Sequence, residues 1–310
     1  MKCMETVQNR ELKRYRNQKM VFRASRASWK IFRFLLLFGL CFILVYPLLY
    51  MLSMAFRDIR DVYDPSVIWV PKHFSLATIR EVIEVMHYPK ALLNSLQVNI
   101  VSSLLQTIVC AVTGYGFARF KFRGRNLMFG IVLFSIIVPP QVTITPLYLS
   151  FKAVSLLNTP MTFYSMALLG NGLKAGLFIF LFRQFFRGMP QELEDAGAID
   201  GCGFFSCFGR IMLPNATPVM ITTVVLSIVW YWNDYFMGSM LINGHETVTM
   251  ALVNLPAALR VAGGYQISDP YKFITSMQAG SLLTIAPVLL FYVIIQRFFI
   301  QGIARSGIVG

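Results

Sequence analysis

The sequence is poor in charged residues, and this scarcity argues against a soluble protein. Of its 310 residues, 14% are charged and only 14 are acidic. A soluble domain carries about 25% charged residues. The sequence also shows no low-complexity linker and no internal repeat of the kind that builds solenoids or propellers. Two soluble domains, the usual expectation for a chain of this length, are therefore disfavoured.

Histidine and cysteine are also too sparse to indicate catalytic or metal chemistry. The three histidines, His73, His87 and His245, are far apart in the chain. Cys202 and Cys207 lie close together, but neither a histidine nor a third cysteine is near them, so no metal site is expected there. The sequence also lacks a phosphate-binding loop and a nucleophile–base set. We therefore expect neither an enzyme nor a metal protein.

Long apolar runs are what the sequence has in abundance. Hydrophobic residues make up 56% of the chain, and the mean hydropathy is +0.61. The run Phe34–Met54 contains no charge and, as a helix, would be about 31 Å long, enough to cross a bilayer. Five further candidate spans follow: Leu92–Phe117, Leu127–Tyr148, Met161–Phe182, Ala216–Phe236 and Ala279–Phe299. The sequence therefore predicts an all-α membrane protein with six transmembrane helices.

The basic residues indicate how these helices are oriented. Of the net charge of +14, residues 1–33 contribute +8 and Arg119–Arg125 contribute +4. Both segments lie on one side of the membrane if six helices alternate, and basic loops are typical of the cytoplasmic side. We therefore expect both termini in the cytoplasm, with the basic arm against anionic membrane lipid rather than nucleic acid.

This topology divides the chain into four parts. Residues 1–33 form a basic cytoplasmic arm, and residues 34–87 form the first transmembrane helix and an outward loop. Residues 88–299 form a five-helix core, and residues 300–310 form a cytoplasmic tail. The connection Met237–Gln278, which contains Pro256, Gly263-Gly264 and Pro270, is expected to be a long outward loop.

One cytoplasmic loop, residues 185–214, is unusually acidic. Four of the 14 acidic residues fall within nine positions: Glu192, Glu194, Asp195 and Asp200. Pro190 suits the first turn of a helix, the acids suit its positive N-terminal end, and Gly201 suits a left-handed stop. A second short helix carries an apolar stripe (Phe204, Phe208, Ile211, Met212) and is expected to end at Pro214. The acids either cap a solvated helix or offer a contact to a basic cytoplasmic partner.

The same loop carries a specific resemblance. Glu194-Asp195-Ala196-Gly197-Ala198-Ile199-Asp200-Gly201, followed by Phe208, Ile211 and Leu213-Pro214, resembles the "EAA…DG…F…I.LP" signature of permease subunits of binding-protein-dependent ABC importers. Further segments resemble the carbohydrate branch, in particular its maltose-type second permeases: Asn94-Ser95, Tyr115–Phe120, Pro146–Tyr148, Trp232–Asp234 and the tail from Gln296 to Gly302. The resemblance covers Tyr88–Gly310. It departs from the signature at Asp195 and Gly197, which replace Glu and Ala, and at Cys202.

The resemblance implies a type I ABC importer permease (MetI-like) core in the bacterial cytoplasmic (inner) membrane. It implies a second homologous permease subunit, two ATPase subunits and an extracytoplasmic solute-binding protein as partners. ATP and Mg would be bound by the ATPase, so this chain needs no cofactor. The ATPase-coupling residues would be Glu194, Asp195, Ala196, Gly197, Asp200 and Gly201. The solute would be a carbohydrate, an oligosaccharide in particular; a non-sugar solute, a membrane-embedded enzyme and a free-standing carrier are the alternatives.

Polar residues inside the spans are candidates for the path of the solute: Lys174, Asn171, Trp232, Asn233 and Asp234. Charges within a membrane are costly and usually face the protein interior or water. Lys174 either lines the solute path or pairs with Asp234 or backbone carbonyls. The aromatic segment around Trp232 either holds a sugar or belongs to the membrane-surface belt or the core. Pro139-Pro140 marks either a broken helix or a simple kink.

Overall fold

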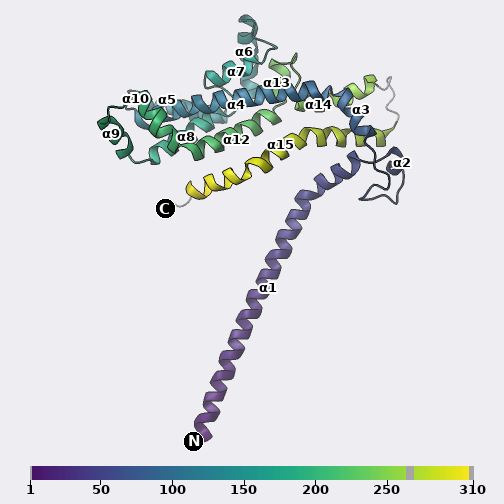
Figure 1. The fold of residues 1–310 in the computed structure, drawn as a ribbon, viewed down its shortest axis with the longest axis vertical. Coiled ribbons are helices and arrows are strands. Elements are labelled where there is room, and N and C mark those ends of the chain that lie inside the picture. Colours follow the sequence, from purple (N-terminus) through teal and green to yellow (C-terminus); the bar gives the residue numbers. More distant parts are fainter. Residues whose placement is uncertain (1, 263–268, 307–310) are drawn as a thin grey trace.

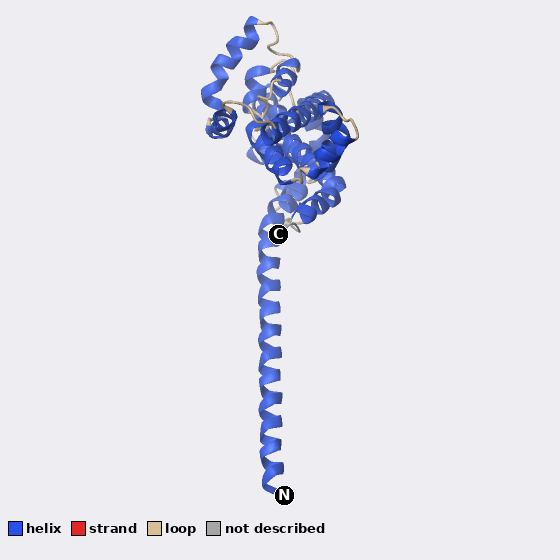
Figure 2. Cartoon of the chain, turned by 90° about the vertical axis from the view of Figure 1, so that its left-hand side faces the viewer, coloured by secondary structure: helices blue, strands red, loops and turns tan. Residues whose placement is uncertain are grey.

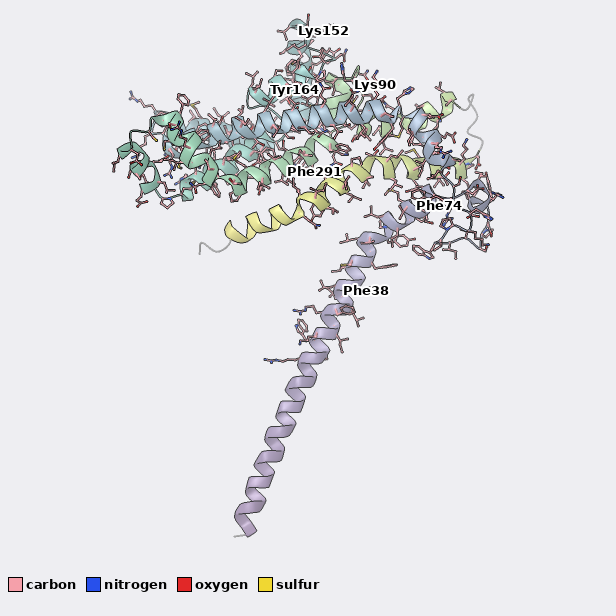
Figure 3. The ribbon with its side chains drawn as sticks, viewed as in Figure 1. Phe38, Phe74, Lys90, Lys152, Tyr164 and Phe291 are labelled. Atoms are coloured by element: carbon pink, nitrogen blue, oxygen red, sulfur yellow. The ribbon has the colours of Figure 1, made fainter. Side chains whose placement is uncertain are left out.

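The computed structural model describes residues 2–262 and 269–306, and its side chains from Arg26 to Gln296 with gaps. Helix α1 (Lys2–Ala55) stands away from a compact helical body (Figures 1 and 2). From Trp29 to Leu49 its large apolar side chains are exposed, that of Phe38 by 62% (Figure 3), whereas Met51, Met54 and Ala55 near its end are buried. The stretch Ser28–Ala55 is long and apolar enough to cross a membrane, yet only 6% of its most apolar window is buried. Within this chain, α1 contacts chiefly α15 (Pro270–Ser306).

The segment after α1 is an ordered loop with two short helices, α2 (Ile59–Val62) and α3 (Ala77–Val85). Asp61 is buried and accepts a hydrogen bond from the backbone N–H of His73, and the ring Nδ1 of His73 also lies 2.7 Å from its carboxylate. Burial by itself raises the pKa of the Asp61 carboxyl, but the contacts from His73 outweigh it, so the pKa lies below its usual range. Asp61 therefore fixes the course of this loop.

Helix α4 (Tyr88–Arg119) runs through the centre of the body and confirms the second predicted span. Its closest neighbour is α8 (Ala175–Gly188). At Gly114, an added Cβ would lie 2.5 Å from the Cβ of Phe182 and 2.9 Å from the backbone nitrogen of Arg183. No other residue fits such a close approach of two helices, so α4 and α8 form a tight pair.

Two of the predicted spans are not continuous helices. The third is broken into α5 (Arg125–Ile137) and α6 (Pro140–Ala153), which meet at 104°. Proline at 139 and 140 explains this break, because proline lacks the N–H group that would continue the helix. The Pro139-Pro140 motif therefore marks a broken helix, not a simple kink.

The prediction of one continuous fourth span was wrong. That segment forms α7 (Met161–Leu168) and α8, separated by a link at residues 169–174. Gly170 has φ +69° and Lys174 has φ +58°, and two left-handed residues cannot belong to a right-handed helix. The apolar composition of the segment concealed this break.

The fifth span departs from the prediction at its end. Helix α12 (Thr217–Asn233) begins one position after the predicted Ala216 and ends three positions before the predicted Phe236, and it meets the preceding helices at 77°. Pro214 does not end the preceding helix: it lies inside α11 (Leu213–Asn215), and the chain turns at Ala216 instead. Proline is tolerated there because it occupies the first turn of α11.

The expected outward loop after α12 is mostly helical. It contains α13 (Phe236–Leu241) and α14 (Val248–Ala262), and Pro256 lies within α14. Gly263-Gly264 lies outside the described residues. The last helix, α15, begins at Pro270, nine positions before the predicted Ala279. The apolar faces of α14 and α15 pack against each other and explain why this region is ordered.

Among the described residues, three helices are long and apolar enough to cross a membrane, and five spans result if each bent pair counts as one. The divided segment of α7 and α8 would be the sixth. The protein is therefore a helical membrane protein, while the count of six and the side on which the termini lie stay predictions.

Candidate functional sites: an acidic surface helix and a cavity

The acidic segment forms helix α9 (Glu192–Ile199) at one end of the body (Figure 1). Gly201 has φ +77° and ends the segment in the left-handed conformation predicted for it. The chain continues through α10 (Phe204–Cys207) and the π-helix η1 (Phe208–Met212). The predicted helix–glycine–helix arrangement is therefore confirmed, although α9 begins two positions after Pro190.

Glu194 is turned inward and ties α9 to the transmembrane body. The hydroxyl of Tyr115 on α4 donates a 2.6 Å hydrogen bond to Oε1 of Glu194. The Nε of Arg119 lies 3.4 Å from Oε2, and Nη2 of Arg119 donates to the carbonyl of Met189 at the end of α8. Only 14% of the Arg119 side chain and 19% of the Glu194 side chain are exposed. We name the contacts of Tyr115, Arg119 and Glu194 the α4–α9 latch.

The latch is embedded in aromatic side chains. The ring of Tyr115 lies 5.0 to 5.5 Å, between centroids, from three phenylalanine rings, those of Phe186, Phe204 and Phe208. These rings come from α8, α10 and η1, so one tyrosine joins four segments of the body. Aromatic packing of this kind shields the latch from water and strengthens its polar contacts.

The other residues expected to couple to an ATPase are arranged differently. Asp195, Ala196, Asp200 and Gly201 are exposed on the surface of the α9 end. Gly197 is buried, and an added Cβ would lie 2.6 Å from Cδ1 of Ile211 on η1. The glycine that departs from the signature therefore lies where α9 packs tightly against η1.

Two large apolar side chains at the same end were missed in the sequence. Ile199 is 87% exposed and Phe205 is 83% exposed. Both lie in the acidic segment, and neither belongs to the apolar stripe of the second short helix (Phe204, Phe208, Ile211, Met212), which is expected to face the core. That mismatch is the signal that could have identified them, because large apolar groups on an acidic surface usually meet a partner.

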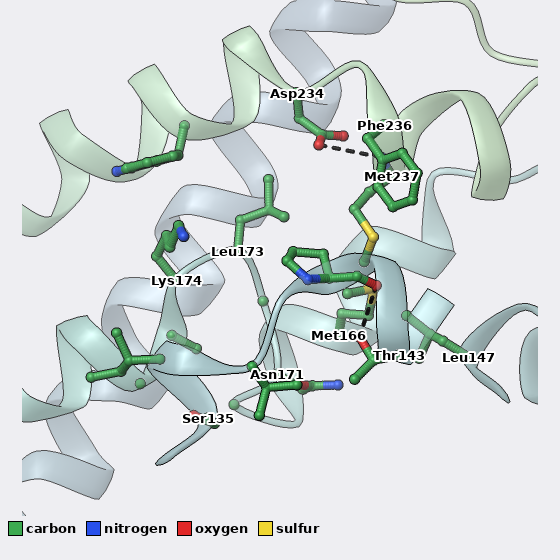
Figure 4. A pocket seen from close by; sticks show the side chains of 18 of the residues that line it. Ser135, Thr143, Leu147, Met166, Asn171, Leu173, Lys174, Asp234, Phe236 and Met237 are labelled. Atoms are coloured by element: carbon green, nitrogen blue, oxygen red, sulfur yellow. Dashed lines mark hydrogen bonds between the residues drawn. The ribbon is translucent and has the colours of Figure 1, made fainter. Parts of the chain in front are cut away.

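A cavity of about 690 Å³ lies between α5, α6, α8 and α12, with the link at residues 169–174 on its wall (Figure 4). It contains four of the five predicted solute-path residues: Asn171, Lys174, Asn233 and Asp234. The structure does not bring Trp232 to the cavity. Trp232 is 6% exposed, and its indole N–H donates to the carbonyl of Thr284 on α15 at 3.1 Å. Its neighbour Trp230 lines the cavity instead.

Lys174 holds a strained and unusual position in this cavity. It has left-handed backbone angles, φ 58° and ψ 24°, which cost a non-glycine residue on the order of 1–2 kcal/mol. Its Nζ lies 4.8 Å from the centre of the Trp230 ring, a cation–π contact. Asp234 does not pair with it. The carboxylate of Asp234 accepts hydrogen bonds from the backbone N–H groups of Met237 and Gly238, at 3.3 and 2.8 Å.

The link that carries Lys174 is fixed by buried polar side chains. The hydroxyl of Tyr231 donates to Oε1 of Gln106, and Nε2 of Gln106 donates to the carbonyl of Leu173, both at 2.6 Å. The N–H of Leu173 in turn donates to the Tyr231 hydroxyl at 3.3 Å. A side chain at Gly172 would collide with both polar groups. We name the contacts of Gln106, Tyr231 and Leu173 the link clamp.

Broken membrane helices around a cavity with a few polar groups, tied to a surface helix at one end, are typical of a transport permease. The comparisons with known proteins agree. Residues 107–305 match the family of inner membrane components of binding-protein-dependent transport systems. The chain belongs to this family.

Curated relatives match over most of their length. A probable ABC transporter permease of Bacillus subtilis is 27% identical, over 90% of this chain and 87% of the relative. An arabinooligosaccharides transport system permease of Halalkalibacterium halodurans is 28% identical, over 87% and 93%. A trehalose transport system permease of Mycobacterium tuberculosis is 26% identical, over 85% and 92%.

A solved structure has the same fold. It belongs to a bacterial ABC transporter involved in the import of the acidic polysaccharide alginate. The TM-score is 0.75 at 20% sequence identity, with 89% of this chain and 98% of the other covered. At this identity the likeness extends to the fold alone.

Proposed function

We propose that this permease carries a carbohydrate across the inner membrane as a subunit of an ATP-driven importer. The relatives whose names state a solute include transporters of arabinooligosaccharides, trehalose and starch degradation products. The proposed assembly contains a second homologous permease, two ATPase subunits that bind ATP and Mg, and an external solute-binding protein. An oligosaccharide is the proposed class of solute.

The observation that carries this proposal is the construction of α9. Its acids Asp195 and Asp200 are exposed, while Glu194 is held by Tyr115 and Arg119 of α4. A helix that is free on one side and latched on the other can receive a force at the surface and pass it to a membrane-spanning helix. We assign α9 as the coupling helix, lying on the cytoplasmic side.

The exposed groups of α9 and of the residues that follow it, up to α10, define what would bind there. Asp195 and Asp200 would pair with basic side chains of the ATPase, and the exposed Ile199 and Phe205 would enter apolar recesses of its surface. Glu194 has a separate task in this proposal, because its carboxylate is already engaged inside the chain. Closure of the two ATPase subunits would then move α9, and with it α4 and α8.

The cavity is the proposed section of the solute path that this subunit contributes. Its lining combines apolar side chains with a few polar groups, as ligand sites do, and Asn171, Asn233 and Lys174 can donate hydrogen bonds to hydroxyl groups. Trp232 is not part of this proposal, since it is buried against α15.

The test is a charge reversal in the assembled complex, reconstituted in proteoliposomes with its binding protein. Asp195→Lys should abolish ATPase recovery or reduce solute-stimulated transport at least tenfold, because two desolvated like charges repel. Glu84→Lys is the matched control, since Glu84 is exposed on α3 at the opposite end of the body. Normal transport by Asp195→Lys would contradict the assignment of α9, and an active lone subunit would contradict the importer.

A further inference from the structure

Lys174 lies in the middle of the apolar segment 161–182, where an ammonium group is expensive. Such a charge persists in membrane proteins when it is paired within the protein or when it has a function. Among the described residues, no carboxylate lies within ion-pair distance of Lys174, and Asp234 is satisfied by backbone N–H groups. The ammonium rests over the Trp230 ring, which leaves its N–H groups free to donate to a ligand.

The position of this charge is determined by the fold rather than by the flexible side chain alone. The link clamp holds both the N–H and the carbonyl of Leu173, the residue directly before Lys174. Helix α8 begins directly after Lys174. The left-handed conformation of Lys174 is therefore imposed from both sides. Strained residues that the surrounding structure holds in this way are typical of binding sites.

The composition of the cavity indicates what this charge would bind. Lys174 is the single cation among the described residues that line the cavity, and the other polar groups, apart from Asp234, are neutral amides and hydroxyls. One ammonium balances one carboxylate. A doubly charged phosphate would remain half balanced. The side chain of Lys174 is exposed in this cavity, so a solute can reach the ammonium, whose charge distinguishes a charged solute from a neutral one.

We propose that Lys174 is a receptor for a carboxylate, and that the solute of this permease is an acidic sugar of the uronate type. This inference rests on the proposed function, because it assigns the solute of the same cavity. Asn171 and Asn233 would hydrogen-bond to the sugar hydroxyls, and the link clamp is a positioning element that keeps the ammonium in place.

The experiment compares acidic sugars with their neutral methyl esters on the purified complex of permeases and ATPase. Calorimetry measures the binding of trigalacturonate, a glucuronate trisaccharide and the fully esterified form of each. The wild-type complex should bind at least one acidic form about tenfold or more tightly than its ester. Lys174→Met should reduce that affinity roughly 10- to 100-fold, because a hydrogen bond to a charged group is lost. It should weaken binding of the ester far less, because the ester offers only neutral groups to the ammonium.

Two further variants keep the result interpretable. Lys174→Arg retains the charge and should retain part of the preference for the acid. Lys152→Met removes an exposed lysine of α6 that does not line the cavity, and it should leave both affinities unchanged (Figure 3).

Three outcomes would overturn the inference: equal binding of acid and ester, an unchanged preference in Lys174→Met, and no binding of any acidic probe. Maltotriose, a neutral sugar, separates this failure from that of the proposed function. If maltotriose stimulates ATP hydrolysis through the binding protein while the acidic probes do not bind, the complex is a sugar importer and the role of Lys174 is wrong.

Discussion

Replacing Glu194 with glutamine should release α9 from the transmembrane body without unfolding it. The variant keeps the size of the side chain and can still accept the hydrogen bond of Tyr115, but it loses the charge that faces Arg119. The hydrogen bond changes from a charge-assisted one, about 1.5–3 kcal/mol, to a neutral one, about 0.5–1.5 kcal/mol. Both ionic side chains are largely buried, so their ion pair is less screened than a surface pair.

The expected loss is about 1–2 kcal/mol, which corresponds to a roughly 5- to 30-fold larger population of detached α9. Amide hydrogen exchange of the permease in nanodiscs, without ATPase, measures this population directly. Exchange at residues 192–199 should accelerate by that factor, while α4 and α8 stay protected. In the full complex, ATP hydrolysis should continue while solute transport falls, because the moving helix no longer carries α4 with it.

The matched control is Glu192→Gln, which removes the same charge from an exposed position on the same helix. It should leave hydrogen exchange unchanged. Unaltered exchange in Glu194→Gln would refute the latch. If that variant instead lost only its binding to the ATPase, Glu194 would be a partner contact like Asp195.

Three further predictions concern single positions. Gly197→Ala should change stability by less than about 1 kcal/mol, because the gain in helix propensity offsets the displacement of the flexible end of Ile211. Thermal unfolding of the complex measures this change. A large loss of stability would mean that η1 cannot move to admit the added methyl group. Trp232→Phe should lower stability by about 1 kcal/mol, because the hydrogen bond to the carbonyl of Thr284 is lost. Solute specificity in transport assays should stay unchanged. Altered specificity would show that Trp232 contacts the solute. The pKa of Asp61 lies below its usual range, so its contacts stabilise the loop after α1 at neutral pH and are lost as the pH falls through that lowered value. Limited proteolysis of residues 57–74 should accelerate in acid, and Asp61→Asn should reduce this pH dependence.

The sequence predicts those features that depend on local chemistry. Apolar length identifies α4 and the start of α12, and a glycine after an acidic helix predicts the left-handed turn at Gly201. The consecutive prolines Pro139 and Pro140 predict either a broken helix or a simple kink, and the structure shows the break between α5 and α6. Each of these signals lies within a few residues of the feature that it specifies.

The features that the sequence does not reveal depend on contacts between distant residues. Glu194 faces inward because of Tyr115, 79 positions away, and the link in the fourth span is held by Gln106, 67 positions before Leu173. No local pattern reports such partners. The apolar composition of residues 161–182 is compatible with both one helix and two, and only the polar contacts from α4 and α12 decide between them.

Helix α8 has a mechanical consequence. It has 14 residues and is therefore about 21 Å long, and it joins the two candidate sites end to end. One end follows Lys174 in the cavity, and the other precedes Met189, whose carbonyl is bonded to Arg119 beside α9. The contact at Gly114 prevents it from sliding against α4.

A stiff rod of this kind transmits displacement in both directions. If a solute in the cavity shifts the near end of α8, it must change the affinity of α9 for its partner, and by thermodynamic reciprocity the partner must change the affinity for the solute by the same factor. Helix α8 would then serve both to report the bound solute to α9 and to transmit the movement of α9 to the cavity.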